Sequence, residues 1–273
     1  MADMAPEELA LMVEFAEADA CVDLCEAVPA QFAAEFGIRV ERIGSAVALM
    51  AEKFDIPLFN RVIGLGVKEP ATETMLEDIA ALYRPSGVKY MVQLSPSAVP
   101  ALLPEWLEAR GMKRRDNWAK AYRRAEPVVS ETSLRLEVIG TEWASAYVNI
   151  AGTAFGMPDI MMSMIAALIG RQGWRHYMTF DGDQPVGIGS LFVRGNIGWL
   201  GVGATLPSHR GRGSQGAIMA RRISDALELG CKWVVTETGE DKPESPNPSY
   251  HNMVRTGFKL AYLRPNYIYN PVR

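Results

Sequence analysis

The stretch Thr205-Leu-Pro-Ser-His-Arg-Gly-Arg-Gly-Ser-Gln-Gly-Ala217 places three glycines and two arginines between a predicted strand and an amphipathic helix. The first turn of a helix exposes backbone N–H groups that have no intrahelical partner, together with the positive end of the helix dipole. A phosphate group binds to such donors. The stretch therefore predicts a phosphate site. Its glycines allow close approach of the main chain and its arginines supply positive charge: Gly211, Gly213, Gly216, Arg210 and Arg212.

The segments around this stretch predict a regular order of strands and helices. Strands are expected at 134–139, 174–180, 186–193, 197–205 and 231–236, and helices at 143–155, 158–170, from within 210–216 to 229, and at 249–255. Residues 258–269 are expected to form two strand segments broken by Pro265, because proline interrupts a strand ladder. The order β-α-α-β-β-β-α-β-α-β predicts an α/β fold with a mixed sheet.

The composition excludes several classes of protein. A chain of 273 residues that is 48% hydrophobic and 22% charged is globular, with a length that favours two domains. Its formal net charge of −4 argues against a nucleic-acid-binding surface. We expect a cytoplasmic protein without membrane contact, since no secretory signal is evident and the apolar run 160–170 is too short to span a bilayer. The three cysteines and three histidines show no ligand spacing, so no metal is expected.

Two other phosphate-binding motifs do not fit the stretch. A P-loop needs Gly-Lys followed by Ser or Thr, and no lysine lies between Lys120 and Lys232. A dinucleotide fingerprint Gly-x-Gly-x-x-Gly is met literally from Gly211 to Gly216. However, a dinucleotide-binding unit starts its parallel sheet at that loop, whereas here three strands precede it and at least two of them form a hairpin.

These residues resemble the GNAT superfamily of N-acetyltransferases. The resemblance covers roughly 130–273 and lies in the loop His209-Arg-Gly-Arg-Gly213, the long helix, the strand 232–236 and the closing helix with Gly257-Phe258. The signature Arg-x-x-Gly-x-Gly/Ala is met at Arg210 and Gly213, whereas Gln215 departs from it at the last small position.

The resemblance implies acetyl-CoA as the co-substrate. The pyrophosphate is expected on the loop, and the pantetheine arm on the strand around Ala204, Thr205 and Leu206. Asn252 either contacts this arm or caps local backbone. The residues expected to bind the cofactor are Ala204, Thr205, Leu206, Arg210, Gly211, Arg212, Gly213, Ser214, Gln215, Gly216 and Asn252.

Acetyl transfer to an amine needs a group that takes a proton from the amine. Glu237 is the candidate base, because strand alternation puts it on one face with Trp233 and Val235, whose apolar surroundings would raise its pKa. The alternative is a solvated carboxylate at a strand end.

The departing thiolate benefits from a proton donor. The family often has a tyrosine four residues before its Gly-Phe pair, but here that position is Met253. Tyr250 is the nearest replacement and Tyr267 a more distant one, although tyrosines in a terminal helix or strand are more often packing residues with a hydrogen-bonded hydroxyl.

The amino half resembles a decayed copy of the carboxyl half. Where the carboxyl half has its glycine loop, the amino half has Lys68-Glu-Pro-Ala-Thr-Glu-Thr74 without glycine, so a second cofactor site is not expected. We predict two tandem GNAT-like domains: 1–127 without a phosphate loop, and 128–273 binding acetyl-CoA. The matching segments are Leu65-Gly-Val67 with Leu200-Gly-Val202, Gly87-Val-Lys-Tyr-Met-Val92 with Gly230-Cys-Lys-Trp-Val-Val235, and Arg110-Gly-Met-Lys113 with Thr256-Gly-Phe-Lys259.

The expected function is an N-acetyltransferase that moves an acetyl group from acetyl-CoA to a primary amine by direct attack in a ternary complex. The acceptor is expected to be a small molecule or a peptide, and a homodimer is left open. The alternative is a catalytically silent acyl-CoA-binding regulatory module, which the missing tyrosine favours.

Overall fold

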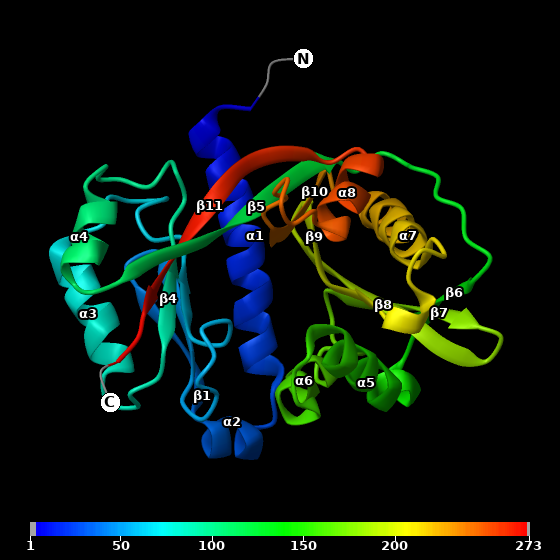
Figure 1. Cartoon of the computed structure of the whole chain (residues 1–273), viewed down its shortest axis with the longest axis horizontal. Helices are drawn as coiled ribbons and strands as arrows, with labels where there is room; N and C mark the ends of the chain where they lie inside the picture. Colours follow the sequence, from blue (N-terminus) through cyan, green and yellow to red (C-terminus); the bar gives the residue numbers. More distant parts are fainter. Residues whose placement is uncertain (1–3, 272–273) are drawn as a thin grey trace. The chain divides into compact units, whose positions relative to one another are not determined.

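The computed structural model describes residues 4–271 (Figure 1). They form two compact units, one made of the described residues up to 120 together with 261–271, and the other of residues 121–260. The predicted boundary between 127 and 128 lies close to this division, but the prediction gave the last strand to the carboxyl-terminal domain. In the structure, residues 261–269 of that strand belong to the first unit.

The first unit contains α1 (Pro6–Ala27), α2 (Ala30–Phe36), β1 (Ile38–Ile43), β2 (Ala46–Ala51), β3 (Arg61–Ile63), α3 (Glu73–Tyr83), β4 (Tyr90–Gln93) and α4 (Leu103–Ala109). The second contains β6 (Arg135–Ile139), α5 (Ala144–Phe155), α6 (Asp159–Ala166), β7 (Trp174–Asp181), β8 (Gln184–Arg194), β9 (Ile197–Thr205), α7 (Ser214–Glu228), β10 (Trp233–Gly239) and α8 (Pro248–Arg255). Two long strands, β5 (Lys113–Arg124) and β11 (Lys259–Tyr269), each have residues in both units.

Both units are built on sheets of mixed direction. The order of hydrogen-bonded strands is β1-β2-β3-β4-β11-β5 in the first unit and β5-β10-β9-β8-β7-β6 in the second. The pairs β3/β4 and β9/β10 are parallel, whereas β1/β2, β2/β3, β4/β11, β6/β7, β7/β8 and β8/β9 are antiparallel. The predicted mixed α/β architecture is confirmed.

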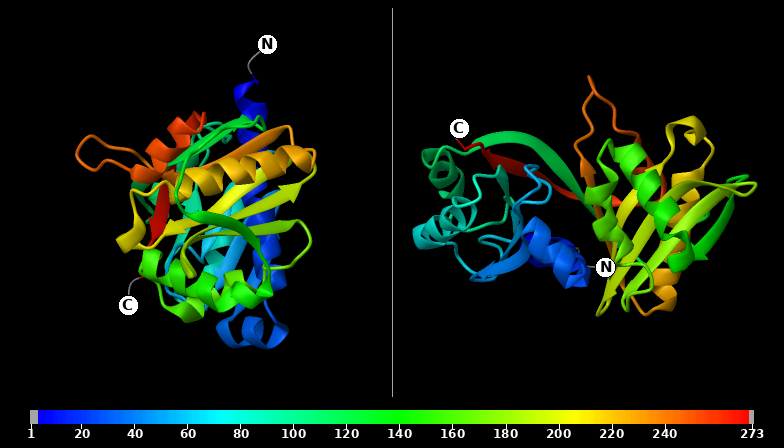
Figure 2. Two further views of the ribbon diagram at one scale, coloured as in Figure 1. Left: turned by 90° about the vertical axis from the view of Figure 1, so that its right-hand side faces the viewer. Right: turned by 90° about the horizontal axis from the view of Figure 1, so that it is seen from below.

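Helices cover both faces of each sheet, so a strand such as β2 is apolar on both of its faces. In β2 every residue is buried. Val47 and Leu49 face the cluster beneath α1, whereas Ala48 and Met50 face the cluster beneath α3 and α4. In the second unit α7 lies on one face of the sheet, and α5 and α6 lie on the other (Figure 2).

The proposed internal repeat aligns the starts of corresponding strands. Tyr90 and Trp233, which match in the repeat, are the first residues of β4 and β10, and Lys113 and Lys259 are the first residues of β5 and β11. By the repeat β11 is the counterpart of β5, yet β11 pairs with β4, the strand of the amino half. The amino-terminal unit is therefore completed by the last strand of the chain.

Residues 258–269 do not form two strand segments, as the sequence predicted, but a single strand from Lys259 to Tyr269. Pro265 falls opposite Leu94, the first residue beyond the end of β4, and its carbonyl accepts the Leu94 N–H at 3.0 Å. The missing proline N–H therefore removes a bond only where the β4 ladder has already ended.

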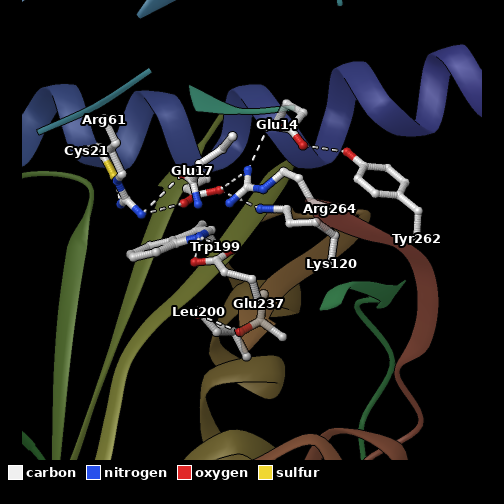
Figure 3. A network of polar contacts seen from close by, with 12 residues as sticks. Glu14, Glu17, Cys21, Arg61, Lys120, Trp199, Leu200, Glu237, Tyr262 and Arg264 are labelled. Carbon is white, nitrogen blue, oxygen red and sulfur yellow. Dashed lines mark hydrogen bonds and ion pairs between the residues drawn. The ribbon is translucent and has the colours of Figure 1, made fainter. Parts of the chain in front are cut away.

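A network of buried ion pairs ties β11 into the first unit (Figure 3). Arg264 of β11 donates to Glu14 at 2.8 Å and to Glu17 at 2.7 Å, both on α1. Glu17 also pairs with Lys120 of β5 at 2.7 Å and with Arg61 of β3 at 3.1 Å. Burying a charge is costly unless it is paired. The network therefore favours the one arrangement in which α1, β3, β5 and β11 supply matching charges.

The pKa of Glu17 depends on two opposing effects, its burial and the charges of its partners. Burial alone would raise it, but the charges of Arg264, Lys120 and Arg61 together lower it well below its ordinary value. A carboxylate with a lowered pKa stabilises the folded state above the pKa of the unfolded chain, and this contribution is lost as the pH falls.

We predict that Glu17→Gln lowers the free energy of unfolding by about 3–5 kcal/mol at pH 7, because three buried cations lose a common anionic partner. The difference from the wild type should shrink as the pH falls below about 4.3, the ordinary pKa of glutamate. Urea denaturation followed by circular dichroism measures both quantities. The exposed Glu26→Gln is the matched control and should change stability by less than about 0.5 kcal/mol. A difference between Glu17→Gln and wild type that is independent of pH would contradict this account.

Candidate functional site

The start of α7 presents free backbone donors. The first backbone bond of the helix runs from Ala217 N to Gly213 O at 3.0 Å, so the N–H groups of Ser214, Gln215 and Gly216 have no acceptor within the helix. Gly213 precedes the helix with a φ of 81° and offers no side-chain cap. These donors are the groups that the sequence predicts for an anion.

The corresponding helix of the first unit starts differently. The Thr72 hydroxyl caps α3 by accepting the Met75 N–H at 3.2 Å. The Met75 N–H, a donor of the first turn, is therefore already bonded to the Thr72 side chain. The starts of α3 and α7 therefore differ in their capping.

The three glycines of the loop have different neighbours. A Cβ added at Gly211, whose φ is 80°, would meet nothing within 4 Å. At Gly213 it would lie 2.4 Å from the Glu131 carbonyl oxygen, and at Gly216 it would lie 2.4 Å from the Ser130 hydroxyl. Gly213 and Gly216 thus permit close approach of the segment 130–131, whereas the space beside Gly211 is open.

The two loop arginines also differ. Arg212 makes a bidentate pair with Asp181 at the end of β7, with N–O distances of 2.5 and 3.0 Å. His209 lies 3.4 Å from the same carboxylate. The hydrogen bond from Arg212, aided by the charges of Arg212 and His209, lowers the pKa of Asp181. Arg210 is exposed and pairs with no carboxylate among residues 4–271, so its charge is directed to solvent beside the loop.

The side chains of Ser214 and Gln215 turn back into the sheet. The Thr205 hydroxyl donates to the Ser214 hydroxyl at 3.3 Å. Gln215 Nε2 donates to the carbonyls of Ala204 at 2.6 Å and Ile188 at 3.2 Å. Gln215, which departs from the family signature, therefore anchors the start of α7 to β8 and β9 while its backbone N–H stays in the first turn.

Strands β9 and β10 separate next to this helix start. Their parallel ladder runs from Ile197 and Trp233 to Leu200 and Thr236, where it ends within the described chain. Strand β9 continues to Thr205 and β10 continues to Gly239. The facing edges of the two strands are therefore open beyond Leu200 and Thr236.

A bulge in β9 accompanies the separation. Ile188 pairs with Ala204 and Ser190 with Gly201, so β9 holds one residue more than β8 in this interval. Val202 within it has a φ of 49°, an unusual value for a β-branched residue. A bulge bends its strand and re-aims the residues that follow.

Backbone direction decides which residues of β9 face the open edge. Leu206 donates its N–H to Val186 of β8 at 2.9 Å. Because backbone groups of successive strand residues point to opposite edges, Ala204 also faces β8, and the N–H and C=O of Thr205 face the gap. Of the three strand residues expected to bind the pantetheine arm, Thr205 presents its backbone to the open edge.

Glu237 follows Thr236, the last paired residue of β10, and so lies where the gap begins. Its two carboxylate oxygens accept the Trp199 indole N–H at 3.2 and 3.1 Å (Figure 3). Gly201 makes room for this indole, because a Cβ there would lie 2.0 Å from the Trp199 ring. The carboxylate that the sequence proposes as the base is thus partly buried and fixed in direction.

The helix α8 carries the other predicted residues. Tyr250 lies in its first turn, where its N–H donates to the capping Asn247 side chain at 3.4 Å. The Asn252 side-chain oxygen accepts from Arg255 at 2.8 Å, which is a bond to a neighbouring side chain rather than to local backbone. Tyr267, the more distant candidate acid, is buried in the first unit, and burial raises its pKa.

Two charged residues of the site were missed by the sequence reasoning. Asp241 accepts the Asn247 N–H at 2.6 Å and pairs with His251 at 3.0 Å, which fixes the loop between β10 and α8. Arg222, a residue of α7, is buried on the side of the helix that faces the sheet. Arg222 shares the apolar face of α7 with Ile218, and a charge at helical spacing among apolar residues is a signal that could have found it.

Among residues 4–271, no group of three or more His, Cys, Asp or Glu side chains is arranged to hold a metal ion. In the same part of the chain, every helix is too short or too polar to cross a membrane.

Solved structures with the same architecture cover nearly the whole chain. A GCN5-related N-acetyltransferase from Kribbella flavida covers 96% of this chain and 96% of its own length, with 15% identity and a TM-score of 0.64. A tandem GNAT protein from the clavulanic acid biosynthesis pathway covers 96% and 95%, with 13% identity and a TM-score of 0.56. The chain has a tandem GNAT fold.

A GCN5-related N-acetyltransferase from Sphaerobacter thermophilus also shares this GNAT fold, at 13% identity, 97% and 93% coverage and a TM-score of 0.62. No protein-family model and no curated protein matches the chain. The predicted GNAT resemblance and the tandem arrangement are thus confirmed as a fold.

We predict that Gly213→Ala destabilises the second unit more than Gly211→Ala, although both glycines have a positive φ. The conformational term alone costs about 1 kcal/mol at either position. At Gly213 the added methyl group also collides with the Glu131 carbonyl, which we expect to cost about a further 2 kcal/mol. Thermal denaturation of the two variants measures the difference. Equal losses would mean that the segment 130–132 does not pack on the loop as described.

Proposed function

We propose that the chain is an N-acetyltransferase that transfers the acetyl group of acetyl-CoA to a primary amine of a small molecule or a peptide. The observation that supports this most directly is the separation of β9 from β10 beside the uncapped start of α7. An open strand edge binds an extended amide chain, and a helix start binds phosphate. Acetyl-CoA carries both groups, and it supplies an acetyl thioester that is activated for attack.

The residues of the loop fit the diphosphate. The N–H groups of Ser214, Gln215 and Gly216 are its donors, Gly211 leaves the space open, and Arg210 supplies a charge that no carboxylate in the described chain neutralises. Arg212 is held by Asp181, so its part is to fix the loop. The amide arm would then bind along β9, with the N–H and C=O of Thr205 as partners.

Glu237 would act as the general base. An alkyl amine has a pKa of about 10 and arrives protonated, so it must lose a proton before its nitrogen can attack. The Glu237 carboxylate would take this proton, and the neutral nitrogen would then attack the thioester carbonyl. As the carbon–sulfur bond breaks, the nitrogen would release its second proton to solvent. Tyr250 is the proposed donor to the departing sulfur. The Trp199 indole holds the carboxylate at the start of the strand gap.

A catalytically silent acyl-CoA-binding module remains the second candidate. The observation that favours it is Met253, which is 2% exposed and occupies the position where the family often has a tyrosine. The two functions differ in one measurement. Release of free thiol from acetyl-CoA across a panel of primary amines indicates the transferase, whereas binding in calorimetry without amine-dependent release indicates the silent module.

We predict that Glu237→Gln lowers kcat by about 10²- to 10⁴-fold, because the amide cannot accept the proton. The dissociation constant for acetyl-CoA should stay unchanged, since the loop and Thr205 are intact. Steady-state kinetics and calorimetry measure the two quantities. The control is Glu244→Gln, an exposed change in the following loop, which should leave both unchanged. Wild-type turnover by Glu237→Gln over the whole pH range would exclude Glu237 as the base.

A further inference from the structure

Two polar side chains of α7 reach through its apolar face to the sheet. Gln215 and Arg222 lie two helical turns apart, so they are on the same side of α7. Gln215 Nε2 donates to Ile188 O and Ala204 O. Arg222 Nη1 donates to Ser190 O at 3.0 Å and Gly201 O at 3.1 Å. Each side chain therefore bridges one carbonyl of β8 and one carbonyl of β9.

The four carbonyls enclose the bulge. The bridge from Arg222 lies just before the extra residue of β9, and the bridge from Gln215 lies just after it. Glycines leave the space for both side chains: a Cβ at Gly189 would lie 3.1 Å from the Arg222 guanidinium carbon, and a Cβ at Gly203 would lie 2.8 Å from Gln215 Oε1. The bulge is thus held from the side of α7 at both of its ends.

The burial of the Arg222 guanidinium lowers the stability of the fold, because the cation loses its hydration. The side chain is 2% exposed, it pairs with no carboxylate in the described chain, and its Nε has no hydrogen-bond partner there. Burial lowers the pKa of Arg222 to about 10. An apolar residue at this position would avoid the desolvation of a cation. The arginine is therefore best explained by the two carbonyls that it holds.

We infer that Gln215 and Arg222 are positioning residues, which fix the β9 bulge so that the backbone of Thr205 faces the open edge in the direction needed by the amide arm of acyl-CoA. The inference rests on the proposed function for the identity of the ligand. We call the hydrogen bonds from Gln215 and Arg222 to the four carbonyls the clamp. Its geometry does not depend on that ligand. Neither residue touches the reacting atoms, so their loss should weaken binding of the thioester more than it slows the chemical step.

The first test needs no ligand. In Arg222→Met and Gln215→Met, residue-resolved hydrogen exchange should show opening of the hydrogen-bonded amides within 201–206, such as that of Leu206, increased by about tenfold or more, a change that corresponds to about 1.4 kcal/mol. The amides of β7 should keep their wild-type exchange. The control is Arg221→Met, which is the same change at the exposed neighbour that pairs with Asp225. Unchanged exchange at 201–206, or an equal increase throughout the unit, would overturn the inference.

The second test uses acetyl-CoA and a saturating amine. We expect Arg222→Met to raise the Kd and KM for acetyl-CoA by about tenfold, while kcat stays within about threefold of wild type. Arg222→Lys, which keeps a cationic nitrogen that can donate hydrogen bonds, should recover part of the affinity. An affinity equal to that of Arg221→Met, or an equal loss in Arg222→Lys and Arg222→Met, would contradict the positioning role.

The two tests separate failure of the inference from failure of the proposed function. If wild-type protein does not bind acetyl-CoA, the proposed function fails, and the exchange experiment still decides whether the clamp holds the bulge. If wild-type protein binds acetyl-CoA and the exchange at 201–206 does not respond to the variants, the proposed function stands and the clamp is rejected.

Discussion

One extra residue in β9 is the constraint on which the candidate site depends. A bulge bends its strand and re-aims the residues that follow it. The bulge around Val202 interrupts the regular pairing of β9 with β8, and the ladder between β9 and β10 ends at Leu200 and Thr236. Beyond that point, Thr205 offers its N–H and C=O to the open edge. The positive φ of Val202 is an energetic cost of the backbone conformation in the bulge.

The helix α7 serves the same site in two ways. Its first turn supplies N–H groups that its own sequence leaves uncapped, and its buried face carries polar side chains to the carbonyls on either side of the bulge. The orientation of the helix on the sheet and the shape of the strand beneath it are therefore linked. A change in either one would shift both the predicted phosphate donors and the edge of β9.

The sequence predicted the parts of the fold that local patterns encode. The hairpin β7–β8 follows from Asp181-Gly-Asp-Gln184, and β9 has the predicted bounds 197–205 because it is a continuous apolar run beside turn residues. The pairing of β11 with β4 of the amino-terminal unit was not predictable from local patterns. It depends on ion pairs of Arg264 with Glu14 and Glu17, which lie about 250 positions earlier. The unbroken strand through Pro265 likewise depends on where β4 ends.

For the candidate site, the sequence proposes residues but not their contacts. Local patterns predicted the loop and Glu237, because a helix start and strand alternation are local properties, whereas Thr205 was implied by the family resemblance. Sequence patterns are local. They could not show that Asp181 holds Arg212, that segment 130–131 fills the space beside Gly213, or that Arg222 is buried, because these depend on contacts between distant segments.

The most direct test is residue-resolved amide exchange of the wild-type protein with and without acetyl-CoA. The account predicts slower exchange at Thr205 and at the amides of 211–216, with no change at the start of α3, whose first turn is capped by Thr72. Protection elsewhere that leaves Thr205 and 211–216 unaffected, or no protection at saturating acetyl-CoA, would contradict it.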